Sequence, residues 1–281
     1  MLGHRLYASL HQEMACAVTV RSDFDALRHY GLFCHDEVFP NTDATDLNAV
    51  SSAIERFRPD VVVNCIGIVK QHPLAKDPIA SLTINSLFPH QVGKICAERD
   101  SRFIHISTDC VFTGAKGNYT EENPTDADDL YGKSKAMGET TAPNALTLRT
   151  SIIGRELVNG TGLVEWFLQN ADQPVKGYTE AKFSGLTTHE LSRAIRRVIT
   201  DHPDLTGLYQ VAAAPIDKCS LLHLIRDAYR LDTPIHPDDA VRIDRTLNGS
   251  RFAAATGYTA PSWPEMVASM AADTTPYTQW R

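Results

Sequence analysis

The segment Tyr131-Gly-Lys-Ser-Lys135 places a phenol and an ammonium group four residues apart. In a helix, residues at this spacing share one face, so both side chains can reach a common site. A phenol with its ordinary pKa of about 10 is a poor acid or base at neutral pH, and a nearby cation lowers that pKa. Lys135 would supply this cation, and the spacing therefore predicts that Tyr131 transfers a proton.

A second polar segment, Ser107-Thr-Asp109, ends an apolar run at 102–107 that we expect to be a strand. Open α/β sheets bind ligands beyond the carboxyl ends of their strands, so Thr108 would donate a hydrogen bond to the oxygen of a carbonyl group that is being reduced. Thr108, Tyr131 and Lys135 together predict a hydride-transfer site. The Tyr-x-x-x-Lys spacing also arises by chance, and it carries this prediction only together with Ser-Thr-Asp and the alternating strands and helices.

The elements that would position these residues alternate along the first half of the chain. We expect helices at 2–10, 23–30, 47–57 and 80–99, and strands at 15–20, 60–65, 102–107, 145–150 and 207–211. This alternation predicts an α/β fold with a Rossmann-like, doubly wound parallel sheet. We expect residues 1–152 with about 200–214 to form a dinucleotide-binding Rossmann domain. Residues of about 153–199 and 215–281 would form a smaller C-terminal substrate-binding lobe.

Composition narrows the class of partner. The chain has 281 residues, of which 43% are hydrophobic and 22% are charged, as in ordinary globular enzymes. The formal net charge of -7, without a run of Lys or Arg, argues against a nucleic-acid partner and leaves a small molecule as the expected ligand. No apolar stretch is long enough to span a bilayer and no signal-peptide pattern is visible, so we expect a cytoplasmic protein without a membrane partner.

Cysteine and histidine usage predicts no metal site. The six cysteines are scattered without a C-x-x-C pair and are expected to be free thiols. The eleven histidines show no metal-ligand pairing, and His105, within an expected strand, is interpreted as a satisfied core residue.

Several motifs together resemble the extended short-chain dehydrogenase/reductase superfamily, and within it the dTDP-4-dehydrorhamnose reductase type. They are Val62-Val-Asn-Cys-Ile-Gly67, Asn85, Ser107-Thr-Asp-Cys-Val-Phe112, Tyr131-Gly-Lys-Ser-Lys-Ala-Met-Gly-Glu139 and Leu148-Arg-Thr-Ser151, and they extend over nearly the whole chain. The resemblance implies reduction of a keto group on a nucleotide-activated sugar, in surface polysaccharide or deoxysugar biosynthesis. It makes Tyr131 the general acid, Lys135 the residue that orients the nicotinamide ribose and lowers the tyrosine pKa, and Thr108 the group that polarises the carbonyl.

The same resemblance implies a substrate site. Asp109 would touch the substrate, although a strand-end aspartate that caps a turn explains it as well. Cys110 replaces an aromatic residue frequent in the rhamnose reductases, which leaves the identity of the sugar open. Phe183-Ser-Gly-Leu-Thr-Thr188 and Arg245-Thr-Leu-Asn-Gly-Ser-Arg251 resemble loops around the sugar nucleotide. Their candidate substrate-binding residues are Ser184, Thr188, Arg245 and Arg251.

A Rossmann cofactor site needs a strand, a glycine-rich turn and a helix whose N-terminus faces the pyrophosphate. Met1-Leu2-Gly3-His4 resembles the last part of such a turn, and no strand precedes it. We therefore expect Leu2 and Gly3 to contact the cofactor and the native reading frame to begin about ten residues upstream, given strands of about 5–6 residues. The alternative is that Gly3 is an incidental glycine at the start of a helix.

Further cofactor contacts follow the other strands. Arg21 and Ser22 suit the 2′-phosphate of NADP(H), which we take as the preferred cofactor with NAD(H) as the alternative, unless Arg21 is a solvated loop residue. Asp43 and Ala44 would contact the adenine by resemblance, although a turn at Asn41-Thr-Asp explains Asp43 equally. The remaining candidates are Cys65, Ile66, Gly67 and Asn85. Gly67 would let the backbone approach the cofactor or be an ordinary strand-end glycine. Asn85 would reach the active-site backbone or be an exposed helical residue.

Two other functions stay open at this point. One is a nucleotide-sugar epimerase or dehydratase with tightly bound NAD, which the absence of a glutamate after Thr108-Asp109 disfavours. The other is a non-catalytic nucleotide-binding protein, which the presence of Thr108, Tyr131 and Lys135 disfavours. The expected partner in all but the last is a nucleotide sugar, and the sequence leaves a homodimer open.

Overall fold

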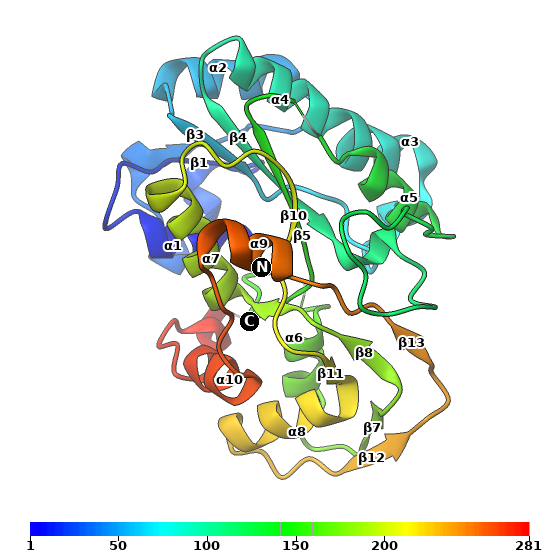
Figure 1. Ribbon diagram of the computed structural model, residues 1–281. Helices are drawn as coiled ribbons and strands as arrows, with labels where there is room; N and C mark the ends of the chain where they lie inside the picture. Colours follow the sequence, from blue (N-terminus) through cyan, green and yellow to red (C-terminus); the bar gives the residue numbers. More distant parts are fainter. Residues whose placement is uncertain (141, 159, 281) are drawn as a thin grey trace.

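A parallel four-stranded sheet forms the centre of the molecule in the computed structural model, which describes residues 1–140, 142–158 and 160–280 (Figure 1). Its strand order is β10-β5-β4-β3, with bounds Gly207–Gln210, Ala145–Thr150, Arg102–Thr108 and Val61–Asn64. The register places Thr108, the last residue of β4, beside Thr150, the last residue of β5. The strands therefore end together at one edge of the sheet, as expected for a ligand site.

Helices cover both faces of this sheet. Ile104 and Leu148 face a core that also contains Leu6 of α1 (Leu2–Leu10) and Ile195 of α7 (Thr188–Asp201). On the other face, Phe103 packs with α2 (Leu47–Phe57) and α4 (Phe88–Ala97). Because Phe103 and Ile104 alternate across the strand, this arrangement confirms the doubly wound α/β fold.

A second, two-stranded parallel sheet lies apart from the first. It pairs β1 (Val18–Thr19) with β2 (Val38–Phe39), and among the described residues neither of these strands pairs with β3. A cavity of about 2040 Å³ is lined by both of these strands, by α1 and by the carboxyl ends of β3 and β4. This volume exceeds the 300–1,000 Å³ typical of a ligand pocket because the cavity joins the cleft at the strand ends to the space between the two sheets.

Three expected elements differ in detail. The strand expected at 15–20 is only two residues long, and the helix expected at 23–30 consists of the 3-10 turns η1 (Phe24–Ala26) and η2 (Arg28–Tyr30). The helix expected at 80–99 is built from α3 (Pro78–Ser81), a π-helical stretch η5 (Leu82–Leu87) and α4. Pro89 explains this change, because it has no N–H to donate to the carbonyl of Asn85.

Much of the chain after β5 forms a lower lobe in Figure 1. Its strands are β7 (Val175–Tyr178) paired with β12 (Ile235–Asp238), and β8 (Ala181–Phe183) between β11 (Ile216–Asp217) and β13 (Ile243–Asp244). Its helices are α6 (Leu163–Gln169), α8 (Lys218–Tyr229) and α10 (Trp263–Ala271), and β6 (Ile152–Ile153) pairs with β9 (Leu186–Thr187) near the junction.

The remaining elements lie elsewhere. The helix α9 (Ser250–Thr256) packs on β10, and α7 packs on α1. The remaining turns are η3 (His35–Glu37), η4 (Pro73–Lys76), η6 (Asp109–Val111) and η7 (Tyr277–Trp280).

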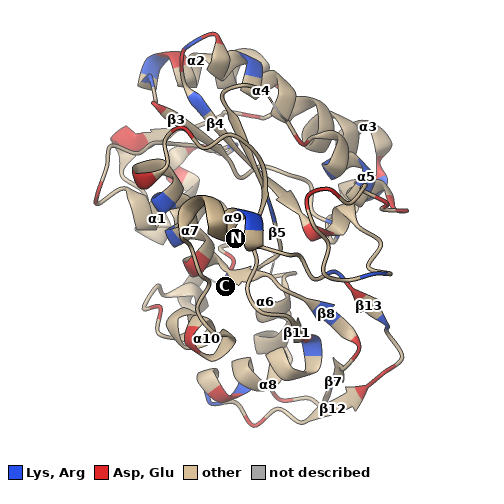
Figure 2. Cartoon of the chain, in the orientation of Figure 1, with Lys and Arg blue, Asp and Glu red and all other residues tan. Residues whose placement is uncertain are grey.

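Charge is mixed over the surface. Lys and Arg are interspersed with Asp and Glu on both the upper part and the lower lobe (Figure 2). Among the described residues, no helix is both long and apolar enough to cross a membrane.

Candidate active site

Thr108, Tyr131 and Lys135 meet at the wall of the large cavity. Thr108 ends β4 and begins the turn η6, where its Oγ1 accepts a hydrogen bond of 3.1 Å from the backbone N–H of Cys110. The same hydroxyl donates to the carboxylate of Asp109 over 3.1 Å. Thr108 is thus fixed by its own turn at the wall of the cavity.

Tyr131 lies in the first turn of α5 (Leu130–Met137), which Asp129 caps by accepting a hydrogen bond of 2.7 Å from the backbone N–H of Gly132. A Cβ atom on Gly132 would lie 2.2 Å from the carbonyl oxygen of Cys110. Only glycine therefore allows α5 to approach η6 so closely. The glycine after Tyr131 in the motif brings the phenol and the Thr108 hydroxyl together.

An ion pair holds the far end of α5 against the sheet. Arg149 on β5 donates two hydrogen bonds of 2.7 Å to the carboxylate of Glu139, and Ser107 on β4 donates a third of 2.6 Å. Both charged side chains are at least nine-tenths buried. Glu139 and Arg149 belong to the motifs of the sequence, and the structure gives them a positioning role.

Lys135 is buried beneath the site. Its Nζ donates a hydrogen bond of 2.8 Å to the carbonyl of Ile106, and it lies 3.5 Å from Nε2 of His105. Burial lowers the pKa of Lys135 to about 8, although the Glu139 carboxylate acts in the opposite direction. Lys135 therefore stays mostly cationic at neutral pH and loses its charge in the mildly alkaline range.

The Tyr131 phenol differs from expectation in its acidity. Burial raises the pKa of Tyr131, with further increases from Cys110 and Asp109, whereas a hydrogen bond from Thr108 lowers it. The lowering of this pKa that was expected from Lys135 is not found, because desolvation of the phenolate is the largest effect. The raised pKa keeps the phenol protonated and available as a donor, and it also makes the phenol a weaker acid than an exposed tyrosine.

The candidate cofactor residues fall into two groups. Besides Tyr131 and Lys135, eight of them line the cavity: Leu2, Gly3, Arg21, Asp43, Ala44, Cys65, Ile66 and Gly67. Gly67 provides a close backbone approach, since a Cβ atom there would lie 3.3 Å from Oδ1 of Asn85 and 3.9 Å from Nζ of Lys135. Asp43 also accepts two hydrogen bonds from Thr45, in a turn that starts at Asp43 and not at Asn41 as expected.

Ser22 and Asn85 are not among the residues that line the cavity. Ser22 is exposed, and its carbonyl accepts a hydrogen bond from the backbone N–H of Asn41. The buried Asn85 side chain bonds to both the N–H and the carbonyl of Ile68, and to Ser134 on α5. Asn85 thus reaches the backbone beside Gly67, as one of the two interpretations expected, and supports the site from behind.

The candidate substrate residues also fall into two groups, those that line the cavity and those that do not. Asp109, Cys110 and Arg245 line the cavity, and Arg245 is anchored by a 2.9 Å hydrogen bond from its Nε to the carbonyl of Phe112. Burial raises the pKa of Asp109, while Lys218 and Arg245 act against this increase.

Ser184, Thr188 and Arg251 are not among the cavity-lining residues. Ser184 bonds to the backbone of Leu247, and Thr188 is buried at the start of α7. Arg251 packs over the ring of Tyr209. Their sequence neighbourhood indicated a loop near the substrate, but packing turns these side chains toward the protein interior or another surface.

Lys218 is a cavity residue that sequence reasoning missed. Lys218 begins α8, and its Nζ lies 3.6 Å from the centre of the Phe183 ring. Its charge interacts with the charges of Asp109 and Arg245. Burial lowers the pKa of Lys218, and Asp109 raises it. No motif marks this lysine, because its place depends on the pairing of β11 with β8.

Three metal-ligand types come together elsewhere, although the sequence showed no such pairing. His11, Cys34 and Glu37 have ligand atoms within 4.8 Å of one another. Glu37 is engaged by the Tyr7 hydroxyl, and Cys34 is exposed. None of the three lines the cavity described above, so the chemistry of that site does not draw on them.

A doubly wound sheet with Thr108 at a strand end beside a Tyr-x-x-x-Lys helix defines the class of the extended short-chain dehydrogenases/reductases, which confirms the resemblance seen in the sequence. The family model described as the RmlD substrate binding domain matches residues 1–275. The chain belongs to this family.

Individual proteins agree with this assignment. A dTDP-4-dehydrorhamnose reductase of Aggregatibacter actinomycetemcomitans is 31% identical over 188 residues, which is 63% of this chain and 63% of that protein. The chain spans less than two thirds of the length of the curated relatives it matches.

Solved structures share the fold. A hypothetical dTDP-4-dehydrorhamnose reductase from Sulfolobus tokodaii has a TM-score of 0.76 at 24% identity, covering 93% of this chain and 94% of that one. The dTDP-4-dehydrorhamnose reductase of Bacillus anthracis in complex with NADP has a TM-score of 0.74 at 19% identity, covering 86% and 92%.

Proposed function

We propose that this protein reduces a keto group on a nucleotide-activated sugar, in polysaccharide or deoxysugar biosynthesis. The observation that carries the proposal is the convergence of Thr108, Tyr131 and Lys135 at the carboxyl end of β4, on the wall of a cavity large enough for a cofactor and a substrate.

The cavity wall suits NADP(H), with NAD(H) as the alternative. Gly67 and Lys135 line the cavity together, where a nicotinamide and its ribose would lie, and the N-terminal turn of α1 with Gly3 suits a pyrophosphate. Arg21, exposed beyond β1, would bind a 2′-phosphate. The dinucleotide would supply the hydride that adds to the carbonyl carbon.

Residues of this chain act on the carbonyl oxygen of the substrate. The Tyr131 phenol donates its proton to the oxygen as the C=O bond becomes a C–O–H group, and the Thr108 hydroxyl turns from Asp109 to donate a hydrogen bond to the same oxygen. The carbonyl would thus gain a hydride from the dinucleotide, which is oxidised by the transfer, and a proton from Tyr131. Lys135 would hold the ribose through the N–H groups that Ile106 does not use.

The lobe supplies the groups that suit the nucleotide end of the substrate. Lys218 and Arg245 face the cavity from α8 and the segment after β13, opposite the carboxyl ends of the strands. Two cations beside the single carboxylate of Asp109 leave an excess of positive charge, which suits the diphosphate of a nucleotide sugar. We propose the lobe, at about 153–199 and 215–281, as the substrate-binding part.

An epimerase or dehydratase that keeps NAD bound is the second candidate, because that branch shares this fold class. Cys110 follows Thr108-Asp109 where an acid–base glutamate would serve a dehydratase, and burial raises the pKa of its thiol to about 12, which keeps it protonated. This observation favours the reductase.

The test is a direct assay of the purified protein with NADPH and a panel of 4-keto nucleotide sugars, followed by the absorbance of the reduced nicotinamide. Stoichiometric oxidation of NADPH with formation of the hydroxyl sugar is expected. Turnover of the sugar without net NADPH consumption, from protein that carries tightly bound nucleotide, would instead identify the epimerase or dehydratase.

A further inference from the structure

A chain of hydrogen bonds beneath the site determines which nitrogen of His105 carries a proton. The side-chain amide of Asn64, at the end of β3, is oriented by the backbone N–H of Ile66, which donates to Oδ1 over 2.9 Å. The NH2 group of Asn64 therefore faces Nδ1 of His105, at 3.2 Å. An NH2 group only donates, so Nδ1 of His105 must accept.

His105 is neutral and carries one ring proton. It is fully buried on β4, and burial together with Lys135 and His90 holds its pKa well below the ordinary value. Because Nδ1 accepts from Asn64, the proton lies on Nε2. That N–H points at Nζ of Lys135, 3.5 Å away.

Two donors thus face each other. The 3.5 Å separation between Nε2 and Nζ is longer than a charge-assisted hydrogen bond of about 2.7–2.9 Å, whereas the Ile106 carbonyl accepts from the same Nζ at 2.8 Å. Lys135 gives one proton to Ile106 and finds no acceptor in His105. Its other protons are left for the side of Gly67, where the nicotinamide ribose is proposed to lie.

We propose that Asn64 and His105 form a positioning pair that holds the Nε2–H tautomer against Lys135 and so directs its remaining N–H groups into the cavity. The functional part of this proposal rests on the reductase assignment, and the tautomer itself does not. Two other groups bear on the charge of Lys135. The Glu139 carboxylate favours the charged form of Lys135 but is shared with Arg149. The Tyr131 phenol is neutral and does not favour either form. The Nε2–H dipole of His105 points at the Lys135 ammonium and, like burial, disfavours the charged form of Lys135.

The first experiment reads the tautomer in protein labelled with 15N-histidine. Long-range 1H–15N correlations distinguish the two neutral forms, and His105 is expected to carry its proton on Nε2. A proton on Nδ1, or on both nitrogens at neutral pH, would overturn the proposal whether or not the protein is a reductase.

The variant Asn64→Asp reverses the arrangement. Its carboxylate still accepts from Ile66 but can only accept from His105, so the imidazole proton moves to Nδ1 and Nε2 becomes an acceptor for the Lys135 ammonium. The alkaline limb of the kcat profile, which reports loss of the Lys135 proton, is expected to move up by about one pH unit or more. A tautomer exchange without this shift would refute the positioning role while leaving the reductase intact.

Two further variants keep the test sharp. His105→Phe removes the opposing N–H. It is expected to move the alkaline limb of the kcat profile upward by about half a pH unit and to raise KM for NADPH. An unchanged limb and an unchanged KM would count against the positioning pair.

Asn123→Asp is the matched control, because Asn123 also accepts a backbone N–H, from Thr120 at 2.8 Å, but in a loop away from the cavity. It is expected to leave both readouts as in the parent protein.

Discussion

Arg149 on β5 forms a buried, bidentate ion pair with Glu139, which lies two residues beyond the end of α5, and both hydrogen bonds are 2.7 Å long. This contact fixes the helix that carries Tyr131 and Lys135 against the strand beside Thr108. The geometry of the proposed site therefore depends on a pair that touches neither cofactor nor substrate.

Removing one partner of this pair is expected to be costly. The variant Arg149→Met leaves the Glu139 carboxylate buried without its counter-ion, and the free energy of unfolding is expected to fall by about 3–5 kcal/mol. Urea unfolding followed by circular dichroism measures it. The control Glu98→Gln removes an exposed pair with Lys94 and is expected to change stability by less than about 0.5 kcal/mol. Equal effects of the two variants would show that the buried pair has no special role.

The Tyr131→Phe variant removes the proposed proton donor and preserves the ring. We expect kcat to fall by about 10²–10⁴-fold, because this is the usual contribution of a positioned acid, while the Kd for NADPH stays nearly unchanged. Stopped-flow turnover and fluorescence titration of NADPH measure the two quantities. Tyr209→Phe, on β10 and outside the cavity lining, is the control. Full turnover by Tyr131→Phe would remove this residue from the mechanism.

Lys218 should act on the charged part of the substrate. The variant Lys218→Met is expected to weaken binding of a nucleoside diphosphate by about tenfold or more, since a charge-assisted hydrogen bond contributes about 1.5–3 kcal/mol, and to leave binding of the free nucleoside unchanged. Calorimetric titrations with the diphosphate, the monophosphate and the nucleoside separate these effects. Lys176→Met, in an exposed ion pair with Asp238, should leave all three unchanged. A loss of nucleoside affinity as large as that for the diphosphate would contradict the assignment.

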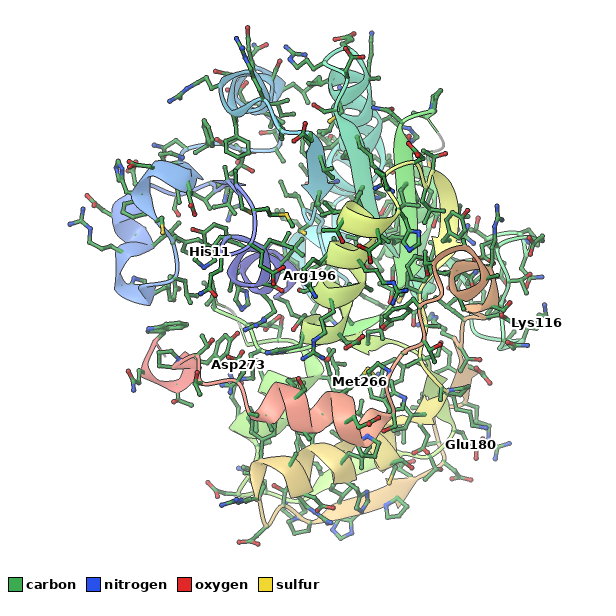
Figure 3. The ribbon with its side chains drawn as sticks, turned by 60° about the vertical axis from the view of Figure 1, so that its left-hand side comes forward. His11, Lys116, Glu180, Arg196, Met266 and Asp273 are labelled. Atoms are coloured by element: carbon green, nitrogen blue, oxygen red, sulfur yellow. The ribbon has the colours of Figure 1, made fainter. Side chains whose placement is uncertain are left out.

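The C-terminal segment should make the fold sensitive to acid. Asp273 accepts hydrogen bonds from Arg5 of α1, His189 of α7 and Thr275, and Figure 3 labels it where this segment meets α1. These bonds hold the pKa of Asp273 well below its ordinary value. A depressed folded-state pKa gives stability that is present above the unfolded pKa of about 4 and is lost as the pH falls.

We therefore expect Asp273→Asn to lower the free energy of unfolding at pH 7 and to lose less of it between pH 7 and pH 3 than the parent protein does. Urea titrations at several pH values measure this difference. Asp239→Asn, whose side chain is exposed beside Arg242, serves as the control. A parent protein and an Asp273 variant with parallel pH curves would disprove the linkage.

The amino-acid sequence by itself determined the helical spacing of Tyr131 and Lys135, the strand that ends at Thr108, and the alternation that makes a doubly wound sheet. These features are local, because they depend on residue spacing and on the period of apolar residues along a few turns or strands. The cofactor residues that follow strands were predicted for the same reason, and six of them line the cavity: Arg21, Asp43, Ala44, Cys65, Ile66 and Gly67.

Only the tertiary structure decided which distant side chains meet. It placed Lys218 in the cavity and turned Ser184, Thr188 and Arg251 away from it. His105 is a buried, hydrogen-bonded core residue as expected, and the structure adds that it faces Lys135. Such contacts depend on how strands register and how helices pack over long sequence separations, and a single sequence carries no periodic signal for them.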